Sequence, residues 1–143
     1  MVTRIAVLGS TGSVGRQTLQ VAESLPERVK VVALGAGRNT ALLNEQIRRF
    51  RPALVSVGHG AHRAEIAHTD VLTGEQGLVA LATHPDVDVV VVATSGKAGL
   101  APTLAALRAG KEVALANKEV LVMAGEIVMA EARARGKVIR PVD

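Results

Sequence analysis

A glycine-rich segment near the start of the chain carries the clearest chemical signal. Residues Gly9–Gly15 read GSTGSVG, after a short apolar run and before a helical pattern. Glycines at this spacing allow a tight turn and a close approach of the backbone to a phosphate, and the N-terminus of the following helix favours an anion. The order G-x-x-G-x-x-G departs from the commoner G-x-G-x-x-G, so the motif alone is weak evidence. Its place between a strand and a helix favours nucleotide binding over a mere tight turn.

The end of the second apolar run bears on which nucleotide is bound. NAD-binding domains usually place Asp or Glu there to hold the ribose hydroxyls, whereas residues 35–39 read GAGRN. Arg38 would pair with a 2′-phosphate and Asn39 could bond the ribose, which favours NADP. The alternative is that Arg38 is a solvated loop cation and that Asn39 only caps the next helix.

Two more polar segments follow apolar runs, Thr94–Leu100 (TSGKAGL) and Ala116–Glu119 (ANKE). The carboxyl ends of strands line the ligand crevice in doubly wound sheets. Small residues in the first segment would let a dinucleotide lie against the backbone, and Lys118 and Glu119 could bind a substrate oxygen and a ribose hydroxyl. The alternatives stay open: a glycine turn in the first segment, and in the second a helix cap at Asn117 followed by a first-turn acid.

Asp143 ends the last apolar run, where a carboxylate could ligate a metal ion. One carboxylate makes no site, so the pattern alone does not support a metal. The four histidines, at positions 59, 62, 68 and 84, lie in loop-like or ambiguous segments. We expect them to be surface residues and not ligands.

The elements that must position these segments alternate along the chain. Strands are predicted over residues 4–8, 30–36, 54–57, 87–93, 113–116 and 138–139, and helices over residues 13–25, 40–50, 75–83, 100–109 and 119–135. Residues 58–74 follow no clear pattern. Such alternation implies a mostly parallel sheet covered on both faces. Right-handed crossovers then give an α/β, doubly wound, Rossmann-like dinucleotide-binding domain.

The composition excludes several classes of protein. The 143 residues suit one domain, and 48% hydrophobic with 21% charged residues is typical of a folded globular chain. The chain has no cysteine, which excludes disulfides and cysteine nucleophiles, and Phe50 is its single aromatic residue, so the core should consist of Val, Leu, Ile and Ala. We find no signal peptide and no apolar run near the roughly 20 residues that span a bilayer, and expect a cytoplasmic protein without a membrane partner.

The charge balance points only weakly to an anionic partner. The chain carries 17 basic and 13 acidic residues, and the basic clusters at residues 48–51 and 133–140 lie near predicted helix C-termini, where cations are favourable. The scarcity of aromatic residues removes the stacking platforms of single-strand binders. We therefore expect no nucleic-acid partner.

Taken together, these segments resemble the N-terminal domain of the 1-deoxy-D-xylulose 5-phosphate reductoisomerase family. The resemblance rests on short motifs and on their order along the chain. They are LGSTGSVG (8–15), AGRN (36–39), AGL with PT (98–100 and 102–103), AGK (109–111), LANKE (115–119) and PVD (141–143). Arg38 replaces a common lysine, and Val14 a common isoleucine. By this resemblance, residues 1–143 form the NADP(H)-binding domain, and the family's catalytic and C-terminal domains lie outside the chain.

The resemblance implies a role for individual residues. The pyrophosphate region of NADPH would be held by Thr11, Gly12, Ser13 and Val14, and the adenosine 2′-phosphate end by Gly37, Arg38 and Asn39. Asn117 and Glu119 would touch the cofactor, Lys118 would be the catalytic, substrate-binding residue, and Asp143 would be the first ligand of Mg²⁺ or Mn²⁺.

The resemblance also implies a reaction. Members of the family rearrange and reduce the phosphosugar 1-deoxy-D-xylulose 5-phosphate to 2-C-methyl-D-erythritol 4-phosphate in non-mevalonate isoprenoid biosynthesis, as homodimers. The metal is a Lewis acid and NADPH supplies the hydride. The family's Ser-Glu-His-Asn continuation is absent after Pro-Val-Asp, so we expect this chain alone to bind NADP(H) without turnover. Two alternatives are another NADP-dependent reductase, such as a semialdehyde dehydrogenase, and a non-catalytic NADP-sensing module.

Overall fold

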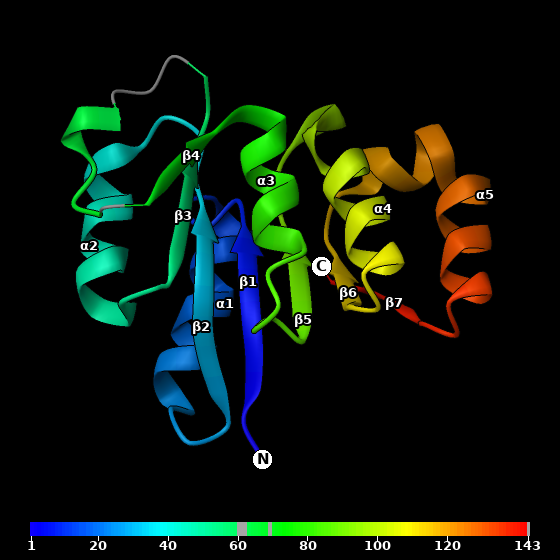
Figure 1. Cartoon of the computed structure of the whole chain (residues 1–143), viewed down its shortest axis with the longest axis horizontal. Coiled ribbons are helices and arrows are strands. Elements are labelled where there is room, and N and C mark those ends of the chain that lie inside the picture. Colours follow the sequence, from blue (N-terminus) through cyan, green and yellow to red (C-terminus); the bar gives the residue numbers. More distant parts are fainter. Residues whose placement is uncertain (60–62, 69, 143) are drawn as a thin grey trace.

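A parallel sheet of seven strands forms the centre of the computed structural model, which describes residues 1–59, 63–68 and 70–142 (Figure 1). The strands are β1 (Thr3–Leu8), β2 (Val29–Gly35), β3 (Leu54–Val57), β4 (Val71–Thr73), β5 (Val89–Val92), β6 (Glu112–Leu115) and β7 (Ile139–Pro141). Their order across the sheet is β4-β3-β2-β1-β5-β6-β7, and all six strand pairs are parallel. The predicted doubly wound fold is confirmed. The strand order reverses between β1 and β5, and such switch points form ligand crevices.

The helices that connect these strands lie close to their predicted positions. They are α1 (Ser13–Ser24), α2 (Thr40–Phe50), α3 (Gly74–Ala82), α4 (Leu100–Arg108) and α5 (Lys118–Ala134), with short 3-10 turns η1 (Arg63–Glu65) and η2 (Gly96–Gly99). The predicted strand over residues 87–93 is too long, because Val87 N–H donates to His84 O in a turn before β5 begins at Val89. Strand β4 was missed, since it has only three residues within an unpatterned stretch.

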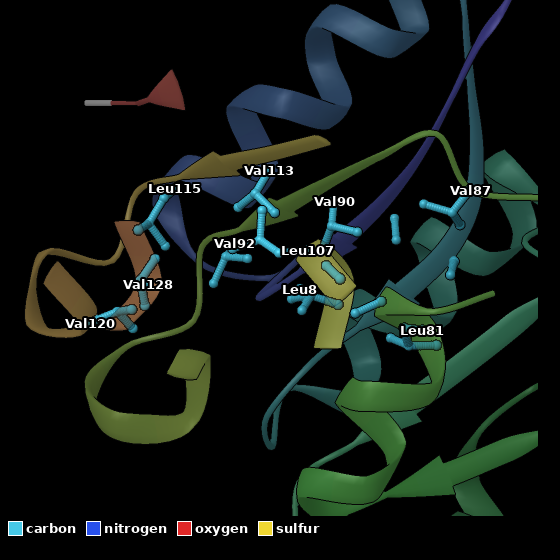
Figure 2. Close-up of a cluster of buried hydrophobic side chains, with 14 of the residues drawn as sticks. Leu8, Leu81, Val87, Val90, Val92, Leu107, Val113, Leu115, Val120 and Val128 are labelled. Carbon is cyan, nitrogen blue, oxygen red and sulfur yellow. The ribbon is translucent and has the colours of Figure 1, made fainter. Parts of the chain in front are cut away.

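Each face of the sheet has its own helices and its own apolar cluster. Helices α3, α4 and α5 cover one face, and Figure 2 shows Leu81, Leu107 and Val128 from these helices gathered with side chains of β1, β5 and β6. Helices α1 and α2 cover the other face, where Leu19 and Leu43 lie in one cluster with buried residues of β1, β2 and β3. The buried clusters contain Leu, Val, Ile and Ala, as the composition predicts.

An ion pair joins β1 to the turn before β5, at the amino-terminal edge of the sheet. Arg4 donates to Asp88 from its backbone N (2.8 Å), its Nε (3.1 Å) and its Nη2 (3.1 Å). In return, Asp88 N donates to Arg4 O at 2.8 Å. The hydrogen bonds from the Arg4 side chain and backbone hold the pKa of the Asp88 carboxyl below its usual value.

Replacing Asp88 by asparagine should therefore lower the Tm at neutral pH and have little effect in acid. The folded-state pKa of Asp88 lies below the unfolded value of about 3.9. The stabilisation by the carboxylate is thus complete above the unfolded pKa and is lost as the pH falls through the folded pKa. The Tm values of the wild type and Asp88→Asn should converge as the pH falls from neutral to below the unfolded pKa of Asp88. A Tm difference that stays constant over this range would contradict the assignment.

Candidate functional site

A cavity of about 810 Å³ opens at the carboxyl-terminal edge of the sheet, above the switch point. This volume lies in the range of roughly 300–1,000 Å³ that is usual for small-molecule and cofactor sites. Its wall is built from the segments that follow β1, β2, β3, β5 and β6, together with the start of α3. Eight predicted site residues line it: Thr11, Gly12, Ser13, Val14, Gly37, Asn117, Lys118 and Glu119.

The turn between β1 and α1 presents the N-terminus of a helix to this cavity. Gly9 has a φ of +87°, and the N–H groups of Gly9 and Ser10 both donate to Gly35 O at 2.8 Å, which fastens the turn to the end of β2. Helix α1 begins at Ser13 after an N-cap glycine, and no side chain of the described residues caps it. Its first N–H groups are therefore available to an anion.

The three glycines of the motif are needed at their positions for different structural reasons. A Cβ at Gly15 would collide with the carbonyl oxygen of Gly9 and lie 2.7 Å from Ser10 Cα. A Cβ at Gly9 would lie 2.6 Å from Ala93 O, so both positions require glycine for the fold itself. At Gly12, a Cβ would lie 3.6 Å from Gly9 O, which is an ordinary contact. Because Gly12 lines the cavity, its missing side chain leaves space for a ligand.

The segment after β2 reaches the cavity through Gly37. Gly58 N–H donates to Gly37 O at 3.0 Å and so joins the loops that follow β2 and β3. The Asn39 side chain accepts a hydrogen bond from Leu42 N at 3.1 Å, as the helix-cap alternative predicts. Arg38 is exposed beside Gly37, outside the cavity wall. The structure therefore brings Gly37 to the cavity and leaves Arg38 and Asn39 at its outer margin.

The segment after β6 combines a helix cap with a place in the cavity wall. Asn117 is 3% exposed, and its Oδ1 accepts from Val120 N at 3.2 Å, so it caps α5. Its Nδ2 donates to Gly96 O at 2.8 Å, and Glu119 Oε2 accepts from Gly96 N at 3.1 Å. Lys118 is exposed and lines the cavity. The cap predicted as an alternative is therefore present, on residues that also border the site.

One part of the wall was not foreseen from the sequence. Val57, His59, Gly74, Glu75 and Leu78 line the cavity from the end of β3 and the start of α3. His59 is exposed, as expected of a surface histidine, but its ring packs where a Cβ of Gly74 would stand. His59 and Gly74 lie within residues 58–74, the stretch without a clear pattern, and the other three lie close to it in the sequence. The signal that the sequence offers is the place of Val57 at the end of a predicted strand, with His59 just after it.

The predicted metal ligand, Asp143, lies outside the described residues, as does His62. Within the described ranges, no three His, Asp or Glu side chains are grouped so that they could hold a metal ion. In the same ranges, no helix has the length and apolar character needed to cross a membrane. A metal site at Asp143 thus stays a prediction.

Comparison with known proteins assigns a family. Residues 5–125 match the family model of 1-deoxy-D-xylulose 5-phosphate reductoisomerase. The 1-deoxy-D-xylulose 5-phosphate reductoisomerase of Anaeromyxobacter dehalogenans is 55% identical over 145 residues, which cover 98% of this chain and 37% of that protein. The chain thus spans just over a third of the length of such curated relatives.

Solved structures agree with this match. A DOX-P reductoisomerase in complex with magnesium superposes with a TM-score of 0.94 at 36% identity, covering 100% of this chain and 38% of that one. The reductoisomerase of Zymomonas mobilis in complex with NADPH gives a TM-score of 0.91 at 36% identity, with 100% and 39% covered. The family match, the identity and the shared fold all lead to one conclusion: the chain belongs to the 1-deoxy-D-xylulose 5-phosphate reductoisomerase family.

Proposed function

We propose that the chain is the NADPH-binding domain of an enzyme that rearranges and reduces 1-deoxy-D-xylulose 5-phosphate to 2-C-methyl-D-erythritol 4-phosphate. The observation that carries the proposal is the glycine turn at Gly12, which opens the N-terminus of α1 toward a large cavity at the switch point. This is the arrangement that binds the pyrophosphate of a dinucleotide. A relative of the same fold was solved in complex with NADPH.

The residues around the cavity fit a dinucleotide. The missing side chain of Gly12 provides space beside Ser13 and Val14, where the pyrophosphate would contact backbone N–H groups. Thr94 Oγ1 is buried at the cavity wall without a hydrogen-bond partner among the described residues, so a polar partner is chemically reasonable there. The adenosine half would lie over β2 and β3, and the nicotinamide half over β5 and β6.

The outer end of the adenosine half is where the chain would choose NADPH over NADH. Gly37 lines the cavity there, and the exposed Arg38 guanidinium follows it directly. A guanidinium donates paired hydrogen bonds to phosphate, whereas NADH offers it only a hydroxyl. Asn39 would bond the ribose from its place at the start of α2.

The remaining roles concern the longer protein. NADPH supplies a hydride when bound, and the residues of this chain bind and orient it. Lys118, exposed on the cavity wall between Asn117 and Glu119, would bind the phosphosugar and place it beside the cofactor. A divalent metal, Mg²⁺ or Mn²⁺, would be bound with Asp143 as one ligand. The longer protein would be a cytoplasmic homodimer.

Lys118 provides the test of this function. The longer protein should consume NADPH when 1-deoxy-D-xylulose 5-phosphate and Mg²⁺ are present, and Lys118→Ala should lower kcat/KM by roughly 10- to 100-fold, the usual effect of losing a hydrogen bond to a charged group. Its Kd for NADPH should stay within about twofold.

Lys111→Ala is the matched control, because Lys111 precedes β6 at the opposite edge of the sheet. It removes the same charge and should leave kcat/KM unchanged. Absence of substrate-dependent NADPH consumption by the wild type would refute the proposed activity. Equal losses in the two lysine variants would refute the role of Lys118.

A further inference from the structure

Both backbone polar groups of Gly96, its N–H and its carbonyl, are held by the segment that follows β6. Gly96 O accepts from Asn117 Nδ2 at 2.8 Å, and Gly96 N–H donates to Glu119 Oε2 at 3.1 Å. We call this arrangement, formed by Gly96, Asn117 and Glu119, the Gly96 clamp. It ties the loop after β5 to the start of α5, although these segments are 21 to 23 residues apart in the chain.

The carboxamide of Asn117 is oriented by the protein alone. Its Oδ1 accepts from Val120 N–H at 3.2 Å while its Nδ2 donates to Gly96, and the residue is 3% exposed. The loop also closes tightly on it, because a Cβ at Gly99 would lie 2.8 Å from Asn117 Nδ2. With both ends of the amide engaged in a buried site, the side chain is fixed before any ligand arrives.

The loop that the clamp holds is part of the cavity wall. Ser95 and Ala98, on either side of Gly96 and Lys97, line the cavity. Gly96 has a φ of +66°, a conformation that glycine adopts at little cost. The two hydrogen bonds select one conformation of this permissive segment, and hence one position for Ser95 and Ala98.

We infer that Asn117 and Glu119 are positioning residues, which fix the Ser95–Ala98 wall against the nicotinamide half of the bound cofactor. This inference rests on the proposed function and gives the two residues a role through the loop, besides the direct contact that the family resemblance implies. The clamp lies on the β5–β6 side of the cavity, away from the adenosine half. Its loss should therefore weaken binding of the nicotinamide half only.

The test compares Glu119→Ala with Glu119→Gln in the full 143-residue chain. Gln retains an oxygen that can accept from Gly96 N–H, whereas Ala does not. The probes are NADPH and adenosine 2′,5′-bisphosphate, which has the adenosine half but no nicotinamide. Glu119→Ala should raise the Kd for NADPH roughly three- to tenfold, as for one lost hydrogen bond, with the Kd for the bisphosphate unchanged. Glu119→Gln should raise the Kd for NADPH clearly less than Glu119→Ala does, because its amide oxygen can still accept from Gly96 N–H, and it should leave the Kd for the bisphosphate unchanged.

Asn117→Asp is a second, independent arm. The introduced carboxylate can still accept from Val120 N–H, so the cap of α5 is retained, but it cannot donate to Gly96 O. We expect the same selective loss for NADPH. The inference would be overturned if a variant lost affinity for NADPH and for the bisphosphate equally, or if neither Glu119→Ala nor Asn117→Asp lost affinity for NADPH. It would also be overturned if Glu119→Gln bound NADPH as weakly as Glu119→Ala.

Hydrogen exchange separates this inference from the proposed function. Without any nucleotide, the Gly96 amide should exchange roughly tenfold faster in Glu119→Ala than in the wild type and Glu119→Gln. An unchanged exchange rate would overturn the clamp. If the wild type binds neither NADPH nor the bisphosphate, the proposed function fails, while the exchange result still decides whether the clamp exists.

Discussion

Replacing Gly15 by alanine is expected to destabilise the chain by about 2–3 kcal/mol and to abolish measurable NADPH binding. The added methyl group would meet the carbonyl oxygen of Gly9 and the backbone of Ser10, neither of which can move like a flexible side chain. Helix α1 would have to shift away from β1, and its N-terminus would leave the phosphate position. Urea unfolding gives the change in the free energy of unfolding, and calorimetry gives the NADPH affinity.

Two other glycines give matched controls for the same substitution. Gly125→Ala lies in α5, where a Cβ would have no described atom within 4 Å, so it should leave NADPH binding intact and raise stability slightly. Gly12→Ala makes only an ordinary contact with Gly9 O at 3.6 Å, so the fold should be retained while the methyl group occupies the ligand's side of the turn. We expect weaker NADPH binding at nearly wild-type stability.

The three variants therefore separate folding from binding at one turn. If Gly15→Ala is as stable as the wild type and binds NADPH as tightly, the close approach of α1 to Gly9 is wrong. If Gly12→Ala binds NADPH like the wild type, the phosphate does not lie at this turn.

Replacing Arg38 by aspartate is expected to weaken NADPH binding by roughly 100-fold and to change NADH binding by less than about threefold. A guanidinium next to Gly37 would donate charge-assisted hydrogen bonds to the 2′-phosphate, and a carboxylate in its place would repel that phosphate. NADH has a hydroxyl at the same position, so it loses little. The two Kd values, measured by calorimetry at fixed salt concentration, give the ratio directly.

The control for net charge is Arg28→Asp. Arg28 is exposed just before β2, at the opposite edge of the sheet from the cavity, and the substitution changes the charge of the chain by the same amount. It should leave the preference for NADPH unchanged. If Arg38→Asp weakened the binding of NADPH and NADH equally, Arg38 would not recognise the 2′-phosphate. The same conclusion would follow if Arg38→Asp and Arg28→Asp had equal effects on the two Kd values.

Much of the fold could be predicted because each strand buried on both faces is a continuous apolar run. Helix α2 begins and ends where its apolar periodicity and the Arg51-Pro52 stop place it. Strand β4 could not be predicted, because its pairing with β3 depends on a neighbour and not on its own three residues. The turn before β5 is closed by the hydrogen bond from Val87 N–H to His84 O, which the apolar pattern of residues 87–93 does not reveal.

The candidate site could be predicted where the local backbone conformation requires a particular type of residue. The glycines of the β1–α1 turn and the Asn117 cap are such cases, since local geometry selects them. The packing of His59 against Gly74 and the clamp on Gly96 join segments distant in sequence, and no local pattern signals them. The sequence offered Asn117 two roles, helix cap or cofactor contact. The structure shows the cap and places the same residue in the cavity wall.

The most direct test of the account is a calorimetric titration of the unmodified chain with NADPH and, separately, with NADH. We predict one NADPH bound per chain, with an affinity at least about tenfold higher than that for NADH, because only NADPH carries the phosphate that Arg38 would bind. Absence of binding by either nucleotide, or equal affinity for both, would contradict the assignment of this cavity to NADPH.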